Sequence, residues 1–272
     1  MLRSVAALGV IAVAITAQAQ HNRLTPAEKK AGWKLLFDGK SFAGWDDPAL
    51  RNPPGASWTI EDGAIKSLAN PKIREDLISK ETFGDFELTF EWKIASGSNS
   101  GVKYMLQKRV MLDQGKHTKG QKFEEFLGQE MARPVADRKH LVGQGEEYTV
   151  AFEYQVIDDT KHADALRGAK YQAGALYSMV GASQRAAKAV GEWNQGRIVR
   201  KGMHVEHWLN GVKVVDSNLD VDDVKHGLEG RWTTSHPVYR LLTELPNKTT
   251  PILLQNHNDP AWFRDIKIRP LH

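Results

Sequence analysis

The chain has 272 residues, 41% of them hydrophobic, which is enough to bury one large core and excludes an intrinsically disordered chain. Its formal net charge is only +4 and it has no long run of lysine and arginine, which argues against a dedicated nucleic-acid-binding protein. The chain has no cysteine, which excludes disulfides, thiolate metal sites and a lipid-anchoring cysteine.

Residues 1–19 have the features of a secretory signal peptide. Arg3 supplies a positive start, residues 5–16 form a short apolar run, and Ala17-Gln18-Ala19 fits the small-x-small cleavage pattern. The apolar run is too short for a comfortable transmembrane helix. We therefore expect cleavage after Ala19, a periplasmic or secreted protein, and no membrane span.

The next segment, residues 20–30, is a lead-in to the predicted domain at residues 31–272. Thr25-Pro26 followed by Glu28 is an N-cap pattern that predicts a short helical or irregular segment. After it, most apolar segments are short, alternate at the strand period, and are separated by Gly, Pro, Asn or Asp.

Several strands and turns stand out along the domain. Asp62-Gly63 predicts a hairpin between residues 58–60 and 64–65, and Asn210-Gly211 predicts one between residues 198–209 and 212–215. Residues 86–94 are the clearest strand, with Phe, Leu and Trp on one face and Glu, Thr and Lys on the other. We also expect a turn at residues 99–101 leading into a strand at 102–106, and a last strand at 262–268.

These elements predict an all-β fold, because many short strands occur without βαβ alternation. We expect a two-sheet antiparallel sandwich of jelly-roll type with a few short helices in long loops. Residues 107–147 and 220–250 are polar and poor in strand signal, with a possible helix near residues 123–131. Loops this long in one domain are often lids or walls of a functional site.

Two strands place polar groups on one face. In EYQVIDD (residues 153–159), Glu153 and Gln155 point away from the face that carries Phe152, Tyr154 and Val156. In LLQNHND (residues 253–259), Gln255 and His257 share a face with Leu253. A carboxylate, an amide and an imidazole opposite an apolar core predict a ligand-binding surface suited to sugar chemistry.

Ten segments in this order resemble the 3-keto-disaccharide (3-keto-glycoside) hydrolase family. They are GWKLLFDGKSFAGW (32–45), WTIEDGAI (58–65), GDFELTFEWKI (84–94), NSGVKYM (99–105), EYQVIDD (153–159), GALY (174–177), GEWNQGRIV (191–199), HVEHWLNG (204–211), LLQNHND (253–259) and WFRDIKIRP (262–270). The resemblance implies a concanavalin A-like sandwich that acts on oxidised glycosides, with a separate glycoside 3-oxidase supplying the substrate.

The chain departs from that family near its C-terminus. Pro251, Asn256, Asn258 and Asp265 stand where the family commonly has Gly, Asp, Gly and Asn. Gln255, His257 and Arg264 keep the family pattern, so the departures bear on substrate scope.

The implied reaction sets the groups that the site needs. A 3-keto group acidifies the neighbouring C2 proton, so a base can form the enolate, the C1 aglycone leaves by β-elimination, and water adds back. This requires a base tuned toward neutral pH, an electrophile for the enolate oxygen, and an acid for the leaving group. It does not require the paired carboxylates of ordinary glycosidases.

Two residues are the candidate catalytic groups. His257 is a base or acid whose ordinary pKa lies near neutral pH, or a strand-end histidine satisfied by hydrogen bonds. Glu153 is the alternative base, a metal ligand, or part of a solvated strand face. HVEH at residues 204–207 is not a zinc-protease helix motif, since His204 and Glu206 share one strand face and His207 takes the other.

The candidate substrate-binding residues are polar or aromatic. Arg264 would bind the keto oxygen or pair structurally with a carboxylate, and Asn99 would bind substrate or support a turn. The remaining candidates are two amides that would bind a sugar hydroxyl, of which Gln155 is also a possible metal ligand, and three residues that would either wall the site or belong to the core: Gln155, Gln255, Tyr177, Trp193 and Asn194.

A divalent metal ion is the one cofactor that the residues suggest, with no organic cofactor expected. Oxygen ligands with an imidazole suit Ca²⁺, Mg²⁺ or Mn²⁺, and Zn²⁺ if histidine dominates. Asp158 is the candidate ligand, or a turn-capping aspartate. It belongs to an acidic segment with Asp159, His162 and Asp164, for which a solvated loop is the alternative.

Two other functions compete with the enzyme reading. One is a non-catalytic carbohydrate-binding sandwich that uses the faces of some of the eight tryptophans. The other is a retaining glycosidase, for which Glu87-x-Thr89-x-Glu91 has the strand spacing but lacks the central acid.

Overall fold

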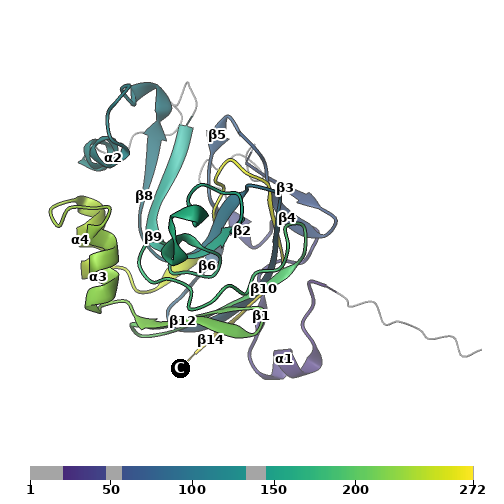
Figure 1. Ribbon diagram of the computed structural model, residues 1–272. Helices are drawn as coiled ribbons and strands as arrows, with labels where there is room; N and C mark the ends of the chain where they lie inside the picture. Colours follow the sequence, from purple (N-terminus) through teal and green to yellow (C-terminus); the bar gives the residue numbers. More distant parts are fainter. Residues whose placement is uncertain (1–20, 47–56, 133–144, 272) are drawn as a thin grey trace, which may run out of the picture.

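The computed structural model describes residues 21–46, 57–132 and 145–271. The predicted signal peptide and the first residue of the lead-in lie outside these ranges. Two β-sheets pack face to face, in strand orders β12-β11-β10-β7-β14-β4-β3 with β1 on β14, and β2-β6-β13-β8-β9-β5 (Figure 1). This confirms the predicted all-β fold, a sandwich of two mostly antiparallel sheets.

The strands of each sheet come from distant parts of the chain. The larger sheet contains β1 (Lys34–Leu35), β3 (Trp58–Glu61), β4 (Ala64–Ser67), β7 (Phe86–Ile94), β10 (Asn194–Lys201), β11 (His204–Leu209), β12 (Val212–Asn218) and β14 (Ala261–Pro270). The smaller sheet contains β2 (Trp45–Asp46), β5 (Ile73–Arg74), β6 (Leu77–Phe83), β8 (Asn99–Asp113), β9 (Gly145–Ile157) and β13 (Thr250–Leu254). Pairing is antiparallel except between β5 and β9, which run parallel over two residues.

Four α-helices and short 3₁₀ turns complete the described part of the chain. They are α1 (Pro26–Lys30), α2 (Phe123–Ala132), α3 (Asp222–Glu229), α4 (Pro237–Glu244), η1 (Gln114–Lys116), η3 (Ala165–Arg167) and η4 (Ala169–Tyr171). The expected N-cap of α1 is present, because Thr25 and Glu28 cap each other's backbone N–H. No helix in the described ranges is both long and apolar enough to cross a membrane.

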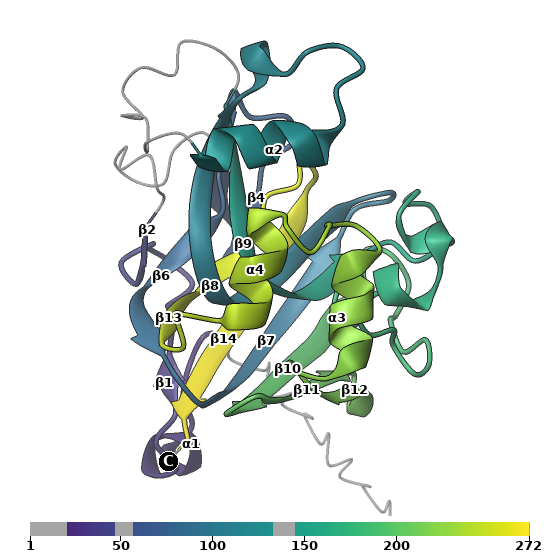
Figure 2. The ribbon, with the colours of Figure 1, turned by 90° about the vertical axis from the view of Figure 1, so that its left-hand side faces the viewer.

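The core lies between the two sheets. In β7 the alternate residues from Phe86 to Ile94 are buried, as the sequence pattern predicts. Phe90 meets Tyr154 of β9 edge to face, with ring centroids 5.3 Å apart. One face of β9 therefore packs into the core and leaves the other face free to build a site. Helices α2 and α4 pack against β8 and β9 (Figure 2).

The two predicted hairpin turns are confirmed. Asp62 and Gly63 both have positive φ (50° and 73°), as do Asn210 and Gly211 (50° and 83°), which is the backbone that a two-residue turn between twisted strands requires. The segment predicted as one strand at 198–209 is two strands, because the chain reverses at Gly202 (φ 61°).

Two predictions along β8 and β9 are wrong. Asn99 begins β8 rather than forming a turn, and pairs in register with Ile157 of β9. The expected loop at 107–147 contains the end of β8, which runs to Asp113, and the start of β9 at Gly145. The expected helix near residues 123–131 is confirmed as α2, and residues 133–144 lie outside the described ranges.

Candidate active site

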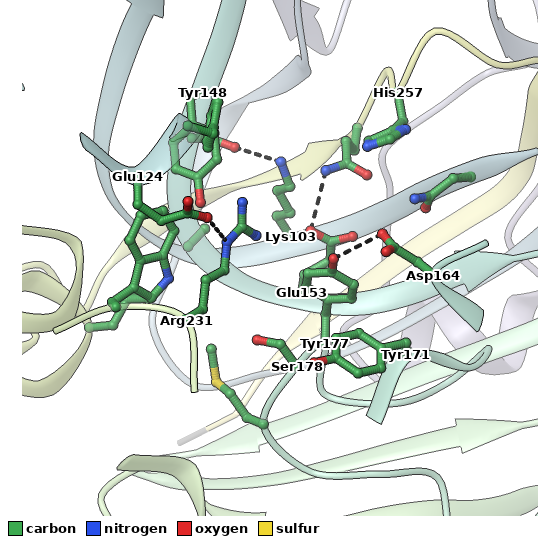
Figure 3. Close-up of a pocket in the computed structure, with 18 of the residues that line it drawn as sticks. Lys103, Glu124, Tyr148, Glu153, Asp164, Tyr171, Tyr177, Ser178, Arg231 and His257 are labelled. Atoms are coloured by element: carbon green, nitrogen blue, oxygen red, sulfur yellow. Dashed lines mark hydrogen bonds and ion pairs between the residues drawn. The ribbon is translucent and has the colours of Figure 1, made fainter. Parts of the chain in front are cut away.

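A cavity of about 820 Å³ lies on the face of the smaller sheet that points away from the core. Its floor is formed by β8, β9 and the segment after β13. Its walls come from α2, from the turn between α3 and α4, and from the segment that contains η3 and η4 (Figure 3). The cavity is thus a sheet surface enclosed by the long excursions of the chain.

Glu153 sits on the cavity floor with only 9% of its surface exposed. Alternation along β9 puts Phe152 and Tyr154 into the core and Glu153 into the cavity, as predicted. Gln255 donates to its carboxylate at 3.3 Å (Figure 3). With the side-chain amide of Gln155 oriented so that its oxygen and its nitrogen both have suitable partners, the nitrogen donates to Glu153 Oε1 at 2.9 Å.

No Lys, Arg or His in the described part of the chain lies within 4.0 Å of the Glu153 carboxylate. Burial raises the pKa of Glu153 to about 7, Lys103 opposes that rise, and Asp76 adds to it. An enclosed carboxylate that only amides hold among the described residues, and whose pKa is raised toward neutral pH, suits a general base.

Lys103 and Asp76 form a buried ion pair beside Glu153. The ammonium nitrogen lies 2.9 Å from Asp76 Oδ2 and 2.8 Å from Thr149 Oγ1. Burial disfavours the charged ammonium, but Asp76 and Glu153 outweigh it and raise the pKa of Lys103. Neither residue stands out in the sequence as a site residue. The alternation Gly101-x-Lys103 would have placed Lys103 on the cavity face if the pairing of β8 with β9 were known.

His257 lies on the cavity lining, beyond the end of β13 at Leu254. The expected strand through residue 257 is therefore too long, although the Gln255 N–H still bonds to Gly101 O at 2.9 Å. The His257 side chain is 39% exposed and its Nδ1 lies 3.9 Å from Asp259 Oδ2. His257 therefore combines access to solvent with access to the cavity.

Tyr177 lines the same side of the cavity. Its hydroxyl donates to Asp164 Oδ2 at 3.2 Å, and Arg167 holds the other oxygen of that carboxylate at 3.0 Å. Burial, followed by the nearby Asp164 and Glu153, raises the pKa of Tyr177. The phenol is thus a neutral hydrogen-bonding group at neutral pH.

The far wall carries a partly buried arginine among aromatic rings. Arg231 Nε pairs with Glu124 Oε1 at 3.2 Å, and its guanidinium carbon lies 4.7 Å from the centroid of the Trp232 ring. Tyr148 and Phe123 complete this wall. All five residues except Tyr148 come from the two excursions that the sequence marked as possible walls. No sequence motif indicated the role of any one of these five residues.

The structure brings together only part of the predicted site. The residues that line the cavity are Glu153, Gln255, His257, Tyr177 and Asn99. Gln155 shares the outward face of β9 with Glu153 but is fully buried and does not line the cavity, so it supports the Glu153 carboxylate through its hydrogen bond.

Trp193, Asn194 and Arg264 do not line this cavity, which corrects the expectations that Trp193 and Asn194 wall it and that Arg264 binds the keto oxygen. Arg264 takes its other expected role, a structural pair with a carboxylate. Arg264 stacks on Trp193 at 3.9 Å and pairs with Glu91 at 2.7 Å, on the face of the larger sheet that points away from the core. Asn194 Oδ1 accepts bonds from Lys188 N–H and Asn210 Nδ2, each at 2.8 Å. These residues stabilise the larger sheet and the loop before β10.

The predicted metal ligand Asp158 caps a turn. Its carboxylate accepts bonds from the N–H groups of Gly97, Thr160 and Lys161 and from the Thr160 hydroxyl, at 2.6–3.2 Å. Oδ1 accepts three of these bonds and Oδ2 one, which is the arrangement of a turn-capping aspartate, the alternative role expected for Asp158.

A different group of possible ligands lies at the rim. Ligand atoms of His162, His257 and Asp259 all lie within 4.8 Å of one another. However, His162 Nδ1 accepts a bond from the Asp164 N–H at 3.1 Å, so the neutral ring carries its proton on Nε2. The ring would have to give up that bond to bind a metal, and we derive no reaction step through an ion here.

Comparison with known proteins agrees with this architecture. The sequence model of the 3-keto-alpha-glucoside-1,2-lyase-like domain matches residues 32–269. A curated 3-keto-disaccharide hydrolase from Bacteroides thetaiotaomicron is 31% identical over 256 residues, which cover 88% of this chain and 79% of that protein.

Two solved structures from Parabacteroides distasonis, both assigned as glycosyl hydrolases, share the fold. One superposes with a TM-score of 0.67 at 25% identity and covers 93% of this chain and 100% of its own. The other gives a TM-score of 0.56 at 25% identity and covers 88% and 99%.

Proposed function

The chain belongs to the family of 3-keto-alpha-glucoside-1,2-lyase-like domains, and we propose that it cleaves the glycosidic bond of 3-keto-glycosides by elimination and then addition of water. The observation that carries this proposal is Glu153, a buried carboxylate with a pKa near 7 that faces a large cavity and is held only by amides. Elimination next to a ketone needs one such base rather than two carboxylates.

In the first step Glu153 removes the C2 proton of the keto sugar. The electron pair moves into the C2–C3 bond, and the C3 oxygen becomes an enolate. A raised pKa makes Glu153 a stronger base than an ordinary glutamate, while about half of it stays ionised at neutral pH. Burial of the carboxylate away from water preserves this property.

Arg231 is the proposed electrophile for the enolate oxygen. Its bond to Glu124 and its contact with Trp232 fix the side chain, which points toward the middle of the cavity (Figure 3). A positioned guanidinium stabilises the negative charge that develops in the transition state. The three hydrogen-bond donors of Lys103 are already used by Asp76, Thr149 and Gln255, so Lys103 is less suited to this role.

His257 is the proposed acid for the leaving group. As the enolate collapses, the C1–O bond breaks and the imidazolium gives its proton to the aglycone oxygen, leaving a C1–C2 double bond. Water then adds at C1 and returns a proton to His257, while Glu153 returns its proton to C2. Release before water adds would give the lyase product instead.

The proposal also covers the source of the substrate and the location of the protein. A 3-keto-glycoside is the oxidation product of an ordinary glycoside, so we propose that a separate glycoside 3-oxidase supplies it. We also propose that the protein is exported to the periplasm or the medium, because of the signal-peptide pattern at residues 1–19.

The retaining-glycosidase alternative finds no support in the geometry. Glu87 pairs with Arg197 and Arg269, and Glu91 pairs with Arg264, all on the face of the larger sheet away from the core. The non-catalytic binding module would bind a sugar without a base, so a test of turnover distinguishes it from the enzyme.

Aglycone release tests the proposal directly. Mature protein is given a 3-keto-glucoside and, in parallel, the unoxidised glucoside, and we expect release only from the keto form. Glu153→Gln and His257→Ala should each lower kcat/KM about 10²- to 10⁴-fold. Glu91→Gln, which removes a carboxylate on the far face of the larger sheet, is the matched control and should not change it.

Two other results would redirect the proposal. Sugar binding without turnover in any arm would favour the binding module. Loss of turnover after chelation, restored by Ca²⁺, Mg²⁺, Mn²⁺ or Zn²⁺, would establish the divalent ion that the sequence suggested.

A further inference from the structure

Glu153 faces a lysine across a strand pair and yet does not pair with it. Lys103 of β8 is the residue directly opposite Glu153 in the antiparallel register. Opposite side chains lie on the same face with Cβ atoms about 4.5–5.5 Å apart, so a Lys and a Glu so placed normally form an ion pair. In the described structure the Lys103 ammonium instead contacts Asp76 and Thr149, at 2.9 and 2.8 Å.

Asp76 is buried and held in position by hydrogen bonds. It lies between β5 and β6 and is 1% exposed. Its Oδ2 accepts from Lys103 and, at 2.7 Å, from the Thr149 hydroxyl, while its Oδ1 accepts from the Asn256 N–H at 3.2 Å. Both oxygens are therefore fixed, and the carboxylate forms a rigid anchor for the ammonium.

The third N–H of the Lys103 ammonium is linked to Glu153 through the side-chain amide of Gln255. In the orientation that satisfies both ends of Gln255, its oxygen accepts from Lys103 at 3.0 Å and its nitrogen donates to Glu153 at 3.3 Å. Gln255 thus separates the cation from the carboxylate.

We propose that Asp76 is a positioning residue which, with Thr149, holds the Lys103 ammonium away from Glu153, so that Glu153 meets the substrate bonded only to amides. The proposal rests on the proposed function in one respect, namely that Glu153 is the base. Without Asp76, the freed ammonium would turn toward Glu153, the other carboxylate whose charge acts on it.

The consequence for the base follows from charge. An opposite charge within about 4–6 Å lowers the pKa of a carboxyl group by about 1–3 units, and a weaker base abstracts a carbon-bound proton more slowly. The other ionisable groups around Glu153 are unchanged by substitution of Asp76 or Lys103. They are Arg231 after α3, Asp164 before η3, Tyr148 on β9, Tyr177 after η4, and His257 after β13.

The test uses variants with opposite expected signs. The carboxyl of Glu153 is titrated directly, by infrared difference spectroscopy or by NMR of ¹³C-labelled glutamate, with Glu153→Gln assigning its signal. Asp76→Asn should lower its midpoint by about one unit or more, and Lys103→Gln should raise it. The double variant, which removes both charges, should return close to wild type.

Activity should follow the same order. The acid limb of kcat/KM should move down in pH for Asp76→Asn and up for Lys103→Gln, with kcat of Asp76→Asn lower on its plateau. Asp46→Asn is the matched control, since it removes the carboxylate of an exposed Lys80–Asp46 pair, and it should change neither property. If Asp76→Asn does not fold, Thr149→Val removes one anchor of Lys103 and should give a smaller downward shift.

The outcomes separate this inference from the proposed function. Midpoints that stay fixed, or that move the same way in Asp76→Asn and Lys103→Gln, would overturn the positioning role, even if activity is lost. Opposite shifts in a protein that cleaves no 3-keto-glycoside would support the positioning role and overturn the proposed reaction.

Discussion

At the scale of single residues, the cavity depends on one glycine. Gly101 of β8 lies beside Glu153, and a Cβ at that position would come within 2.3 Å of Glu153 Oε1 and 2.7 Å of its Cγ. Those contacts are too short for the carboxylate to stay in place. Gly101 therefore sets where the base lies as much as Glu153 itself does.

Gly101→Ala should leave the fold intact and displace the carboxylate. Because a misplacement of about 1 Å can cost about 100-fold in rate, we expect kcat/KM to fall by about that factor. Gly84→Ala is the matched control, since the nearest atom to its new Cβ is Thr249 Oγ1 at 3.5 Å. Equal activity of the two variants, measured with equal melting temperatures, would contradict the expected crowding of Glu153.

A second prediction at this scale concerns pH. Burial raises the pKa of Glu153 to about 7, and only the ionised carboxylate can accept a proton. We expect kcat/KM on a 3-keto-glucoside to rise about tenfold per pH unit on the acid side of its profile, with the limb ending at about pH 7. An acid limb near pH 4.5, the ordinary range of glutamate, would contradict a base whose pKa is raised by burial.

The alternation of polar and apolar residues along a strand predicted only part of the site. The period of two correctly put Glu153 opposite Phe152 and Tyr154, because it reports which residues share a face. It does not report which outward face carries the cavity, and Arg264 was therefore placed at the site although it lies on the other sheet. Lys103 and Asp76, 27 residues apart in sequence, meet only through the pairing of strands.

At the scale of elements, turns were easier to predict than the long arm of β8 and β9. Asp62-Gly63 and Asn210-Gly211 specify their backbone locally, so both hairpins were found. The outer part of β8 and β9 carries charged side chains that pair across the arm, such as Arg109 with Glu147 at 2.5 Å. In sequence these charges look like a solvated loop.

The wall built by α2 and the turn after α3 should bind the keto sugar, because it carries Arg231, the proposed electrophile for the C3 oxygen. Phe123→Ala removes an aromatic surface from that wall, so we expect KM to rise severalfold both for a 3-keto-glycoside with a large aglycone and for a methyl 3-keto-glucoside. Trp193→Ala, an aromatic truncation away from the cavity, should change neither value. A rise in KM for the large aglycone alone in Phe123→Ala would mean that this wall binds the leaving group instead.

At the scale of the whole molecule, the sandwich separates two buried titratable groups. Glu153 faces the cavity, whereas His207 of β11 lies in the core, bonded to the Tyr104 hydroxyl and to Gly174 O, each at 2.9 Å. Burial lowers the pKa of His207 from 6.5 to about 4, against an opposing effect of the Gly174 carbonyl. HVEH thus has the predicted faces, with His207 inward and His204 and Glu206 outward.

These two groups should oppose each other in the pH dependence of stability. The His207 pKa is depressed on folding, so the unfolded chain binds more protons between pH 6.5 and about 4, and stability falls as the pH drops through that window. The Glu153 pKa is raised on folding, so the native state binds more protons between pH 4.5 and about 7, and stability falls as the pH rises. Each slope reaches about 1.4 kcal/mol per pH unit, so in the wild type they nearly cancel where the windows overlap.

Removing either group should expose the other. Between pH 6.5 and 4.5, Glu153→Gln should lose stability more steeply than wild type on acidification, because only the penalty for protonating His207 remains. His207→Gln should instead gain stability relative to wild type on acidification through this range. His204→Gln, which changes a partly exposed histidine on the same strand, should have the same pH dependence of stability as wild type. Urea unfolding at several pH values measures these slopes. Parallel slopes for Glu153→Gln and wild type would mean that Glu153 titrates alike in the folded and unfolded chain, and would remove the main physical reason for assigning it as the base.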